Sequence, residues 1–417
     1  MKNIKVLQNK TFLSFMLIFI FAVVSSVILA QSNPKNAVEE LKAKNQSTVV
    51  EVKKDAKFKI DTTTEIARRK ISEITGAKPP SERELKRLEE ERRKLEAERL
   101  RKEEERKKKE ELESQRIERE RQEELKRLEA ERKKKEDELK KEQDKKKQEE
   151  LKKQEEELKK KQEELKKQEE ERKKLEEQKK NEQAKKEQMS DRNIPLNMAP
   201  SISLAAFAWN GKNTSTQVQY QGICGSCWAF TAAAVYETNY LIKNQKPIRV
   251  SEQILLDCSK GGSCDGGWYG GVFDYLMTKG AKTADKYPYK GTVGACADNS
   301  VSKYTVIKWG YIKPNAGIPS VKEMKEAIAK YGAIAATVKV TPAFQVYKSG
   351  IFDEHAKVSG PNDVNHAIVI VGWDDKKQAY LVKNSWGPQW GENGYVWVEY
   401  GCNNIGYGAA WVVVAQE

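Results

Sequence analysis

Aromatic residues are missing from a long central part of this chain, since no Phe, Tyr or Trp occurs between Phe58 and Phe207. Cysteine is confined as well, because all six cysteines stand at or after Cys224. So long a stretch without aromatic residues excludes a single compact fold over all 417 residues. We therefore expect one domain of ordinary size, at residues 200–417, behind a long polar arm.

Glycine and proline are also absent from residues 81–189, where Glu, Lys, Arg, Gln and Leu dominate. This composition predicts a long charged α-helix. Ser81 and Glu84 form a capping box at its start, and Pro195 stops any continuation, which leaves residues 190–199 as a linker.

The apolar seam of this helix is incomplete. Leu151, Leu158 and Leu165 recur every seven residues, but the companion positions Gln154 and Lys161 are polar. Two interpretations stay open: a largely isolated helix that acts as a spacer, and a weak coiled coil through which the arms self-associate. The net charge is +14, yet Glu is interleaved throughout the arm and no aromatic residue offers stacking, so we expect no nucleic-acid partner.

The N-terminus looks like an export signal. Lys2, Lys5 and Lys10 precede a mostly apolar stretch at residues 11–30, which is long enough to span a bilayer. A cleaved signal peptide and a retained membrane anchor therefore both remain open for residues 1–30. Residues 31–80 follow with apolar side chains too sparse for a core, and we expect a flexible polar linker there.

Cys227 has the local sequence of an activated thiol. It follows Gly225 and Ser226 and opens a run of helix-forming residues, with Ser226 suited to the N-cap. A thiol is mostly protonated at neutral pH, so a nucleophile needs a helix N-terminus and an imidazolium to stabilise its thiolate.

Three other residues supply the remaining parts of such a site. His366 opens an apolar strand and is the expected acid and base, and Asn384 would orient its ring. Gln221, six residues before Cys227, would donate to the developing oxyanion. The chain has two histidines, and His355, in a polar loop, is the weaker candidate for the base. Singly each residue has an ordinary explanation, but together their order and spacing match one mechanism.

The segment Gln221-Gly-Ile-Cys-Gly-Ser-Cys227-Trp, followed far downstream by Asn365-His366-Ala and Asn384-Ser-Trp-Gly, resembles the papain and cathepsin family of cysteine peptidases. Further similar segments run from Ser251 to Cys258 and from Trp386 to Tyr395. The resemblance extends from near Ala199 to the C-terminus. It implies an α+β fold with a helical lobe, a lobe made of a twisted antiparallel sheet, and the site in the cleft between them.

The resemblance also implies roles for individual residues. Gly267 would pair with the substrate backbone, Trp386 would shield the His366 to Asn384 bond, and the neighbouring pocket would be lined by Trp268, Tyr269 and Ala367. The family pattern pairs Cys224 with Cys264 and Cys258 with Cys296 in disulfides. Cys402 is then left over, either as a buried inert thiol or as an exposed one that can cross-link chains. The family's inhibitory propeptide docks through aromatic residues, and no such motif precedes this domain.

The sequence thus predicts an exported cysteine peptidase that hydrolyses peptide bonds through a Cys227 thioester, with protein or peptide substrates and with no metal or organic cofactor. Two histidines are too few for the paired-His loop with which one cathepsin grips a substrate C-terminus, which favours an endopeptidase. The enzyme would be secreted, periplasmic or lysosome-like, or membrane-anchored with its peptidase outside the cytoplasm. Two alternatives remain: a transpeptidase or ligase using the same residues, and a surface stalk protein whose peptidase-like head is a binding module.

Overall fold

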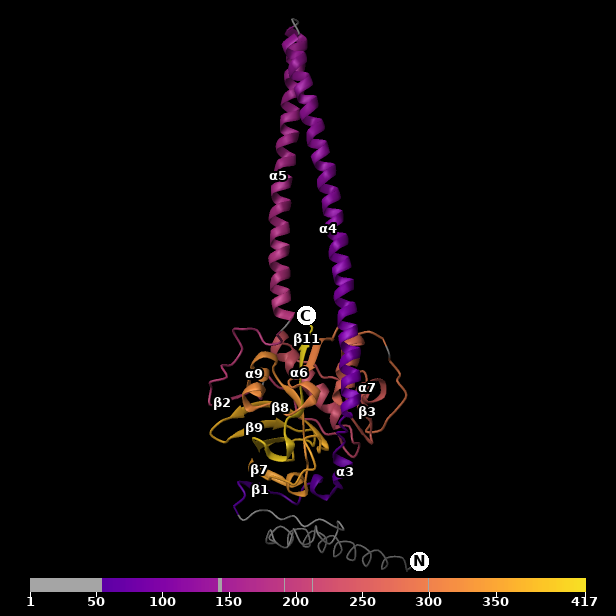
Figure 1. The fold of residues 1–417 in the computed structure, drawn as a ribbon, viewed down its shortest axis with the longest axis vertical. Coiled ribbons are helices and arrows are strands. Elements are labelled where there is room, and N and C mark those ends of the chain that lie inside the picture. The colour runs from indigo at the N-terminus through magenta and orange to yellow at the C-terminus, as the bar shows by residue number, and fades with distance from the viewer. Residues whose placement is uncertain (1–54, 142–144, 191, 212, 299) are drawn as a thin grey trace, which may run out of the picture. The chain divides into compact units, whose positions relative to one another are not determined.

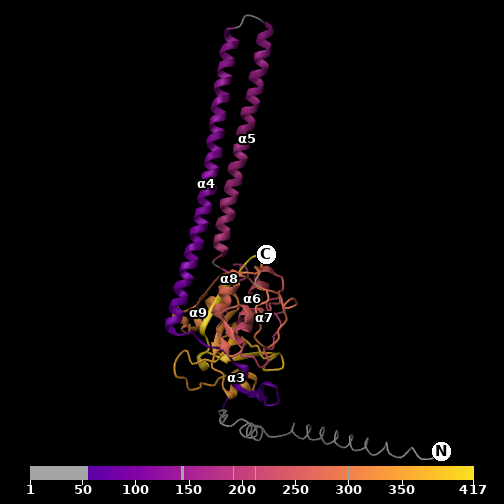
Figure 2. The ribbon, with the colours of Figure 1, turned by 90° about the vertical axis from the view of Figure 1, so that its right-hand side faces the viewer.

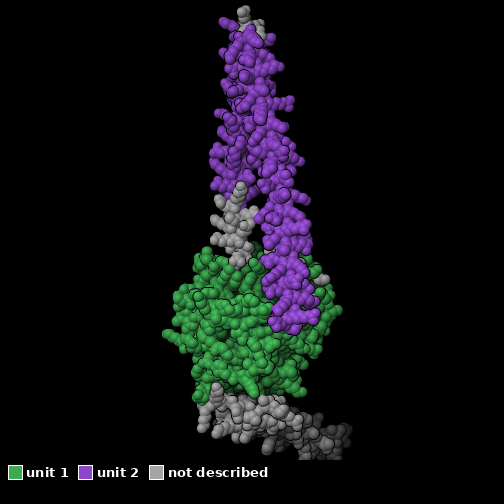
Figure 3. Space-filling model, in the orientation of Figure 1, with its two compact units in different colours: residues 1–80, 192–417 green, residues 81–191 purple. Residues whose placement is uncertain are grey.

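The computed structural model describes residues 55–141, 145–190, 192–211, 213–298 and 300–417. The chain divides into two units, one formed by residues 1–80 together with 192–417 and the other by residues 81–191 (Figure 3). The first unit therefore takes its chain from both sides of the second. We call the first unit the head and the second the arm.

A long sheet forms one side of the head, in the order β1-β7-β10-β9-β8-β6-β11-β5, with β2 added to β8 (Figure 1). Its strands are β1 Phe58–Ile60, β2 Ala206–Ala208, β5 Val306–Tyr311, β6 Ile334–Val338, β7 Tyr347–Phe352, β8 His366–Asp374, β9 Ala379–Lys383, β10 Tyr395–Glu399 and β11 Tyr407–Val414. Neighbouring strands are antiparallel except β7 and β10, which pair in parallel. The expected antiparallel sheet is thus present, with one parallel pair.

Helices make up the other lobe, and the longest of them, α6, packs against β8 and β11. The helices of the head are α3 Ile71–Ile74, α6 Cys227–Asn244, α7 Glu252–Cys258, α8 Tyr269–Thr278, α9 Val321–Tyr331 and α10 Pro342–Gln345; short 3₁₀ turns are η2 Ile66–Arg68, η3 Pro314–Ala316 and η4 Cys402–Asn404, and a two-stranded ribbon pairs β3 Gly262–Ser263 with β4 Gly266–Gly267. Ser320 and Glu323 form a capping box at the start of α9. The two-lobed α+β prediction is confirmed.

Residues 55–80 differ from the flexible linker that we expected. Strand β1 pairs with β7, and the side chains of Ile66 and Ile74 are buried in the head. The Gln345 amide donates to the carbonyl oxygens of Ile66 and Arg69 at 2.5 and 2.7 Å. Phe58, the one aromatic residue of this stretch, packs against Phe352 and Tyr347 with ring centroids 5.0 and 6.3 Å apart. Backbone hydrogen bonds and a few buried aliphatic side chains complete the docking.

The head also begins earlier than position 200. Ile194 is fully buried, and the Asn193 side chain accepts from the Val414 N–H at 3.0 Å and donates to the Asn239 carbonyl at 3.1 Å. These contacts make the end of the expected linker part of the head, since a buried amide that bonds two elements is a fixed structural residue.

The arm contains two helices rather than one, α4 Glu82–Lys141 and α5 Lys145–Ser190, and they run side by side (Figures 1 and 2). An Arg172 to Glu118 ion pair at 2.5 Å and a bond from the Arg121 guanidinium to the Leu165 carbonyl join them. Leu158, from the incomplete seam, is buried. The incomplete apolar seam on α5 therefore packs against α4 of the same chain. The sequence analysis did not consider such an intrachain hairpin.

Among the described residues, no helix combines the length and the apolar character needed to cross a membrane. The proposed export signal, residues 1–30, lies outside the described residues.

The pair Glu118 and Arg172 tests the hairpin, because these residues would lie about 80 Å apart in one continuous helix. We expect E118R or R172E alone to destabilise the isolated arm by about 0.5–1 kcal/mol and the double swap to restore most of that loss. Thermal unfolding followed by circular dichroism measures this effect. Additive losses in the double variant would contradict the hairpin. The control is E104R, at an exposed α4 position.

Candidate active site

Cys227 is the first residue of α6, so its thiol lies at the positive end of the helix dipole. The preceding residue, Ser226, occupies the N-cap position as predicted, but its side chain does not cap the helix. The Ser226 hydroxyl lies 2.8 Å from the Tyr289 hydroxyl instead. The Ser226 carbonyl accepts from the Ala229 and Phe230 N–H groups at 2.8 and 3.1 Å, so the residue begins the helix through its backbone and not through the side-chain bond that the sequence suggested.

His366 is the first residue of β8 and is fully buried. Its Nε2 lies 2.8 Å from Oδ1 of Asn384, which follows the end of β9, the neighbouring strand. Because an amide oxygen only accepts, this bond places the proton on Nε2 and leaves Nδ1 free to accept one. Nδ1 has no hydrogen-bond partner among the described residues. The Trp386 ring packs against the imidazole with centroids 4.7 Å apart, as expected for a shield.

Gln221 is fully buried, with its side chain held at both ends. Its Nε2 donates to the Cys224 carbonyl at 3.0 Å, and its Oε1 accepts from the Ser385 hydroxyl at 2.7 Å. The second N–H of this amide remains available for an oxyanion, because an amide nitrogen carries two hydrogens.

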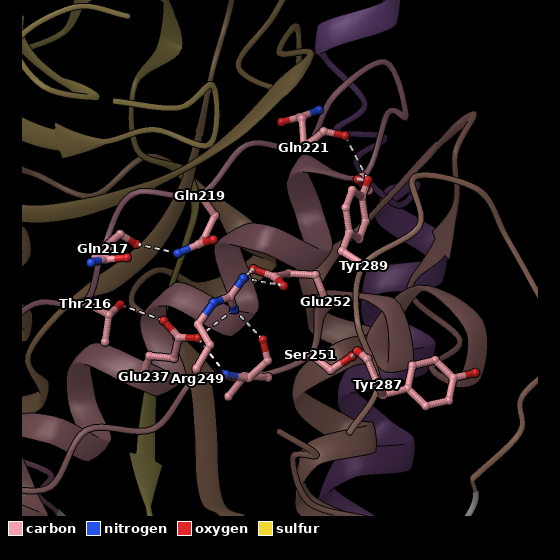
Figure 4. A network of polar contacts seen from close by, with 12 residues as sticks. Thr216, Gln217, Gln219, Gln221, Glu237, Arg249, Ser251, Glu252, Tyr287 and Tyr289 are labelled. Atoms are coloured by element: carbon pink, nitrogen blue, oxygen red, sulfur yellow. Dashed lines mark hydrogen bonds and ion pairs between the residues drawn. The ribbon is translucent and has the colours of Figure 1, made fainter. Parts of the chain in front are cut away.

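A polar network holds the chain that leads to Gln221 (Figure 4). The Glu237 carboxylate accepts from the Thr216 hydroxyl at 2.6 Å and from the Arg249 guanidinium at 3.0 Å, and Arg249 also pairs with Glu252 at 2.7 Å. At the far end the Tyr289 hydroxyl donates to the Gln221 carbonyl at 2.9 Å. These bonds tie the loop to α6 and α7, and so position the amide through buried, charge-assisted contacts.

The thiol is covered by part of the chain that precedes the arm, residues 74–78, which we call the covering segment. Its Gly76 and Ala77 N–H groups donate to the Asn365 carbonyl at 2.9 and 2.8 Å. Gly267 donates to the Gly76 carbonyl at 2.7 Å and accepts from the Lys78 N–H at 2.9 Å, in parallel pairing. Gly267 thus bonds an extended peptide backbone that belongs to the chain itself, and its role toward a substrate stays a prediction.

Glycine is required where the covering segment passes closest to the site. A Cβ added at Gly76 would lie 2.0 Å from the Gly225 carbonyl oxygen, two residues before the nucleophile. Toward the other side of the thiol, the Trp386 indole N–H donates to the Ile74 carbonyl at 2.8 Å. The segment therefore crosses the site and bonds to both lobes of the cleft.

Enclosure keeps both reacting groups uncharged. Burial raises the pKa of the Cys227 thiol to about 12, an effect that backbone N–H groups, led by Ala367 at 3.4 Å from the sulfur, oppose only in part. Burial also lowers the pKa of His366 to about 4, against the hydrogen bond to Asn384, which raises it. The covered site thus holds a neutral thiol and a neutral imidazole.

The residues expected to shield the site or to line its pocket divide into two groups. Ala367 and Trp386 contact the thiol and the covering segment, as described above. Tyr269 is fully buried, with its hydroxyl donating to the Gly408 carbonyl, and Trp268 stacks on it and donates to the Tyr311 hydroxyl at 2.7 Å. In the covered state these two aromatic residues belong to the core more than to a surface.

The structure contains both disulfides that the family pattern implied, Cys224–Cys264 and Cys258–Cys296. Cys402 is buried and unpaired by disulfide, which fits the first of the two interpretations of this residue. His355 lies 3.6 Å from the Cys402 sulfur rather than beside Cys227. Of the two histidines, His366 thus lies next to the residues that contact the Cys227 sulfur and the covering segment, and its catalytic role stays a prediction. The sequence analysis missed the covering segment, because residues 74–78 show no local pattern that differs from a linker.

The fold thus brings a thiol at a helix N-terminus close to an imidazole that is held by an amide. Comparison with known proteins specifies the family. The model of the papain family of cysteine proteases matches residues 204–414, about half of the chain. The chain therefore belongs to the papain family of cysteine proteases.

Two curated relatives and one solved structure are similar to this part of the chain. The chain is 35% identical over 212 residues to mouse (Mus musculus) pro-cathepsin H and 37% identical over 227 residues to ananain from pineapple (Ananas comosus), covering 49% and 50% of this chain and 63% of each relative. A solved structure of bromelain from Ananas comosus with the E64 inhibitor is 31% identical, with a TM-score of 0.44, and covers 51% of this chain and 100% of that one. The match thus spans less than two thirds of either curated relative.

The lowered pKa of His366 predicts a pH dependence of head stability. Its pKa rises from about 4 in the folded state to its ordinary 6.5 on unfolding, so the unfolded state binds more protons between these values and stability falls as the pH falls through that window. We expect this one group to remove about 3 kcal/mol between pH 6.5 and pH 4.

The measurement is denaturant unfolding followed by tryptophan fluorescence, which reports the head alone because all nine Trp residues lie after Phe207. The comparison is Cys227→Ser against Cys227→Ser with His366→Gln, and the pH slope should be shallower in the second protein. Equal slopes in both would show that His366 is not held neutral.

Proposed function

We propose that this chain is the latent precursor of an exported cysteine endopeptidase, with Cys227 as nucleophile, His366 as acid and base, Asn384 as the residue that orients the imidazole, and Gln221 as an oxyanion donor. The observation that carries the proposal is that a peptide segment of the chain itself lies over a thiol at a helix N-terminus, with a buried imidazole held in one tautomer close by.

The chemistry would run through an acyl-enzyme. The Cys227 thiolate attacks the carbonyl carbon, the carbonyl oxygen takes the negative charge, and the Cys227 N–H and the free Gln221 N–H stabilise it. The His366 imidazolium then gives its proton to the leaving amine, and a thioester remains on the sulfur. A water molecule, deprotonated by His366, attacks that thioester and releases the acid, which returns the thiol and imidazole to their starting state.

Endopeptidase action is supported by the course of the covering segment. It bonds Gly267 on one side of the thiol and Trp386 on the other without a break in the chain. A cleft that accepts a continuous peptide on both sides of the nucleophile suits cleavage within a chain. Export is supported by the sequence of residues 1–30 and by the two disulfides, which persist in oxidising compartments.

Latency is supported by the enclosure of the site. A thiol with a pKa near 12 beside an imidazole with a pKa near 4 cannot form the ion pair that attack requires. Removing the covering segment would return water to both groups and move both pKa values toward the ordinary ones, which favours the thiolate and imidazolium. Hydrolysis and transpeptidation share the thioester, so the ligase alternative differs only in which nucleophile resolves it.

Disruption of the covering segment should expose the nucleophile. In full-length protein we expect Gly76→Val to accelerate alkylation of Cys227 by an epoxide or by iodoacetamide at least tenfold at pH 6, because the added side chain would clash with the Gly225 backbone. Gly317→Ala, where a Cβ meets nothing closer than 3.6 Å, is the control. Equal labelling of wild type and Gly76→Val would contradict latency, and the labelled residue is identified by peptide mass mapping.

The roles of the two residues that act on the thiol separate in the same Gly76→Val background. His366→Ala should abolish both labelling at mildly acidic pH and hydrolysis of peptide substrates, because the other histidine, His355, lies beside Cys402 and not beside Cys227. Asn384→Ala should lower kcat by less, since it exchanges no proton. Persistent labelling of Cys402 with Cys227 unmodified would overturn the assignment of the nucleophile.

A further inference from the structure

A second cluster of chemically reactive side chains lies at the edge of the sheet, outside the machinery described above. His355 follows the end of β7, Glu399 ends β10 and Cys402 begins η4. Strands β7 and β10 pair in parallel, so their carboxyl ends reach the same edge. One ligand atom of each of the three residues lies within 4.8 Å of the other two.

The distances within this cluster match a metal-ligand geometry. His355 Nε2 lies 3.2 Å from Glu399 Oε2 and 3.6 Å from Cys402 Sγ, and Sγ lies 3.8 Å from Oε2. In a tetrahedral zinc site, ordinary bond lengths place nitrogen about 3.3 Å from oxygen and sulfur about 3.5 Å from either. The three distances between these ligand atoms are therefore already close to the distances expected around a bound zinc ion. We propose that Cys402, His355 and Glu399 form a zinc-binding site, with a fourth position open to water.

The loop that carries His355 is fixed by the residue next to Cys402. The Asn403 side chain accepts from the Ala356 N–H at 2.8 Å and donates to the Glu354 carboxylate at 3.1 Å. Both chain neighbours of His355 are thus tied to the turn that presents Cys402. A site whose ligands are positioned before the metal arrives loses less entropy on binding it.

Glu399 is oriented in the same way. Its Oε1 accepts from the Lys57 ammonium at 2.6 Å, which leaves Oε2 as the oxygen that faces His355 and Cys402. Such outer contacts to a ligating carboxylate are a usual part of metal sites. The charges also balance, because one thiolate and one carboxylate neutralise a divalent ion, and Lys57 keeps a second acidic neighbour in Asp353.

The site would be structural and separate from peptide hydrolysis. Cys402 is fully buried, while the His355 side chain is 53% exposed, so an ion can reach the cluster from solvent without opening the core. Lys57 precedes β1, and a bound ion that holds Glu399 in place would support the docking of that strand.

The proposal is tested with zinc and cobalt on untagged full-length Cys227→Ser protein, which lacks the other free thiol and is handled without reductant to keep the disulfides. After gel filtration we expect about one zinc per chain, and with cobalt a thiolate charge-transfer absorption. Cys402→Ser should abolish that absorption, and both His355→Ala and Glu399→Gln should weaken zinc binding at least tenfold.

Glu326→Gln, at an exposed position of α9, is the matched control and should bind zinc as the parent does. His355→Ala is the variant that guards against misfolding, because its side chain is half exposed. The proposal is overturned if the parent retains no zinc, or if zinc is retained equally in the His355 and Cys402 variants, which would place the ion elsewhere in the chain.

Discussion

Backbone pairing between the covering segment and the rim of the cleft is the interaction on which the state of the site depends. Gly267 and Asn365 lie on opposite lobes, and both bond the short stretch from Gly76 to Lys78. Backbone groups are the same in every peptide, so these bonds hold a strand of any sequence that can approach closely enough. Side chains decide the approach, and here Gly76 permits a contact that any larger residue would prevent.

This pairing also sets the electrostatics of the catalytic residues. The helix dipole at Cys227 and the amide of Asn384 both favour the charged pair, yet enclosure outweighs them, and both groups stay neutral. The same side chains would therefore be inactive when covered and competent when hydrated. The latent and the active state would thus use the same residues. They would differ in the exposure of the Cys227 sulfur and the His366 imidazole to water.

At one edge of the sheet, the part of the head that precedes the arm in the sequence meets the part that follows it. Strand β1 comes from before the arm, β7 and β10 from after it, and Lys57 bonds Glu399 across that boundary. A metal at Cys402, His355 and Glu399 would act at this junction rather than at the thiol. In the sequence, the arm is inserted between the covering segment and Ile194. The sheet of the head contains strands from both sides of this insertion.

Much of the head could be predicted from sequence, because local patterns there have one solution. Cys227 at a helix start and His366 at the start of an apolar strand each depend on neighbours a few residues away, and the structure has both. The two disulfides followed from the family pattern rather than from spacing alone.

The arm and the covering segment could not be predicted in the same way. Whether Leu158 faces solvent, a second chain or its own chain depends on a reversal between α4 and α5 that the charge pattern does not encode. Residues 74–78 have no aromatic residue and little apolar surface, so nothing local distinguishes them from a linker. The sequence alone determined which residues can do thiol chemistry. Only the tertiary structure decided that Cys227 is covered, because the covering segment bonds residues more than a hundred positions away in the chain. It also decided that Cys402 lies beside His355, because the parallel pairing of β7 and β10 brings the ends of these two strands together.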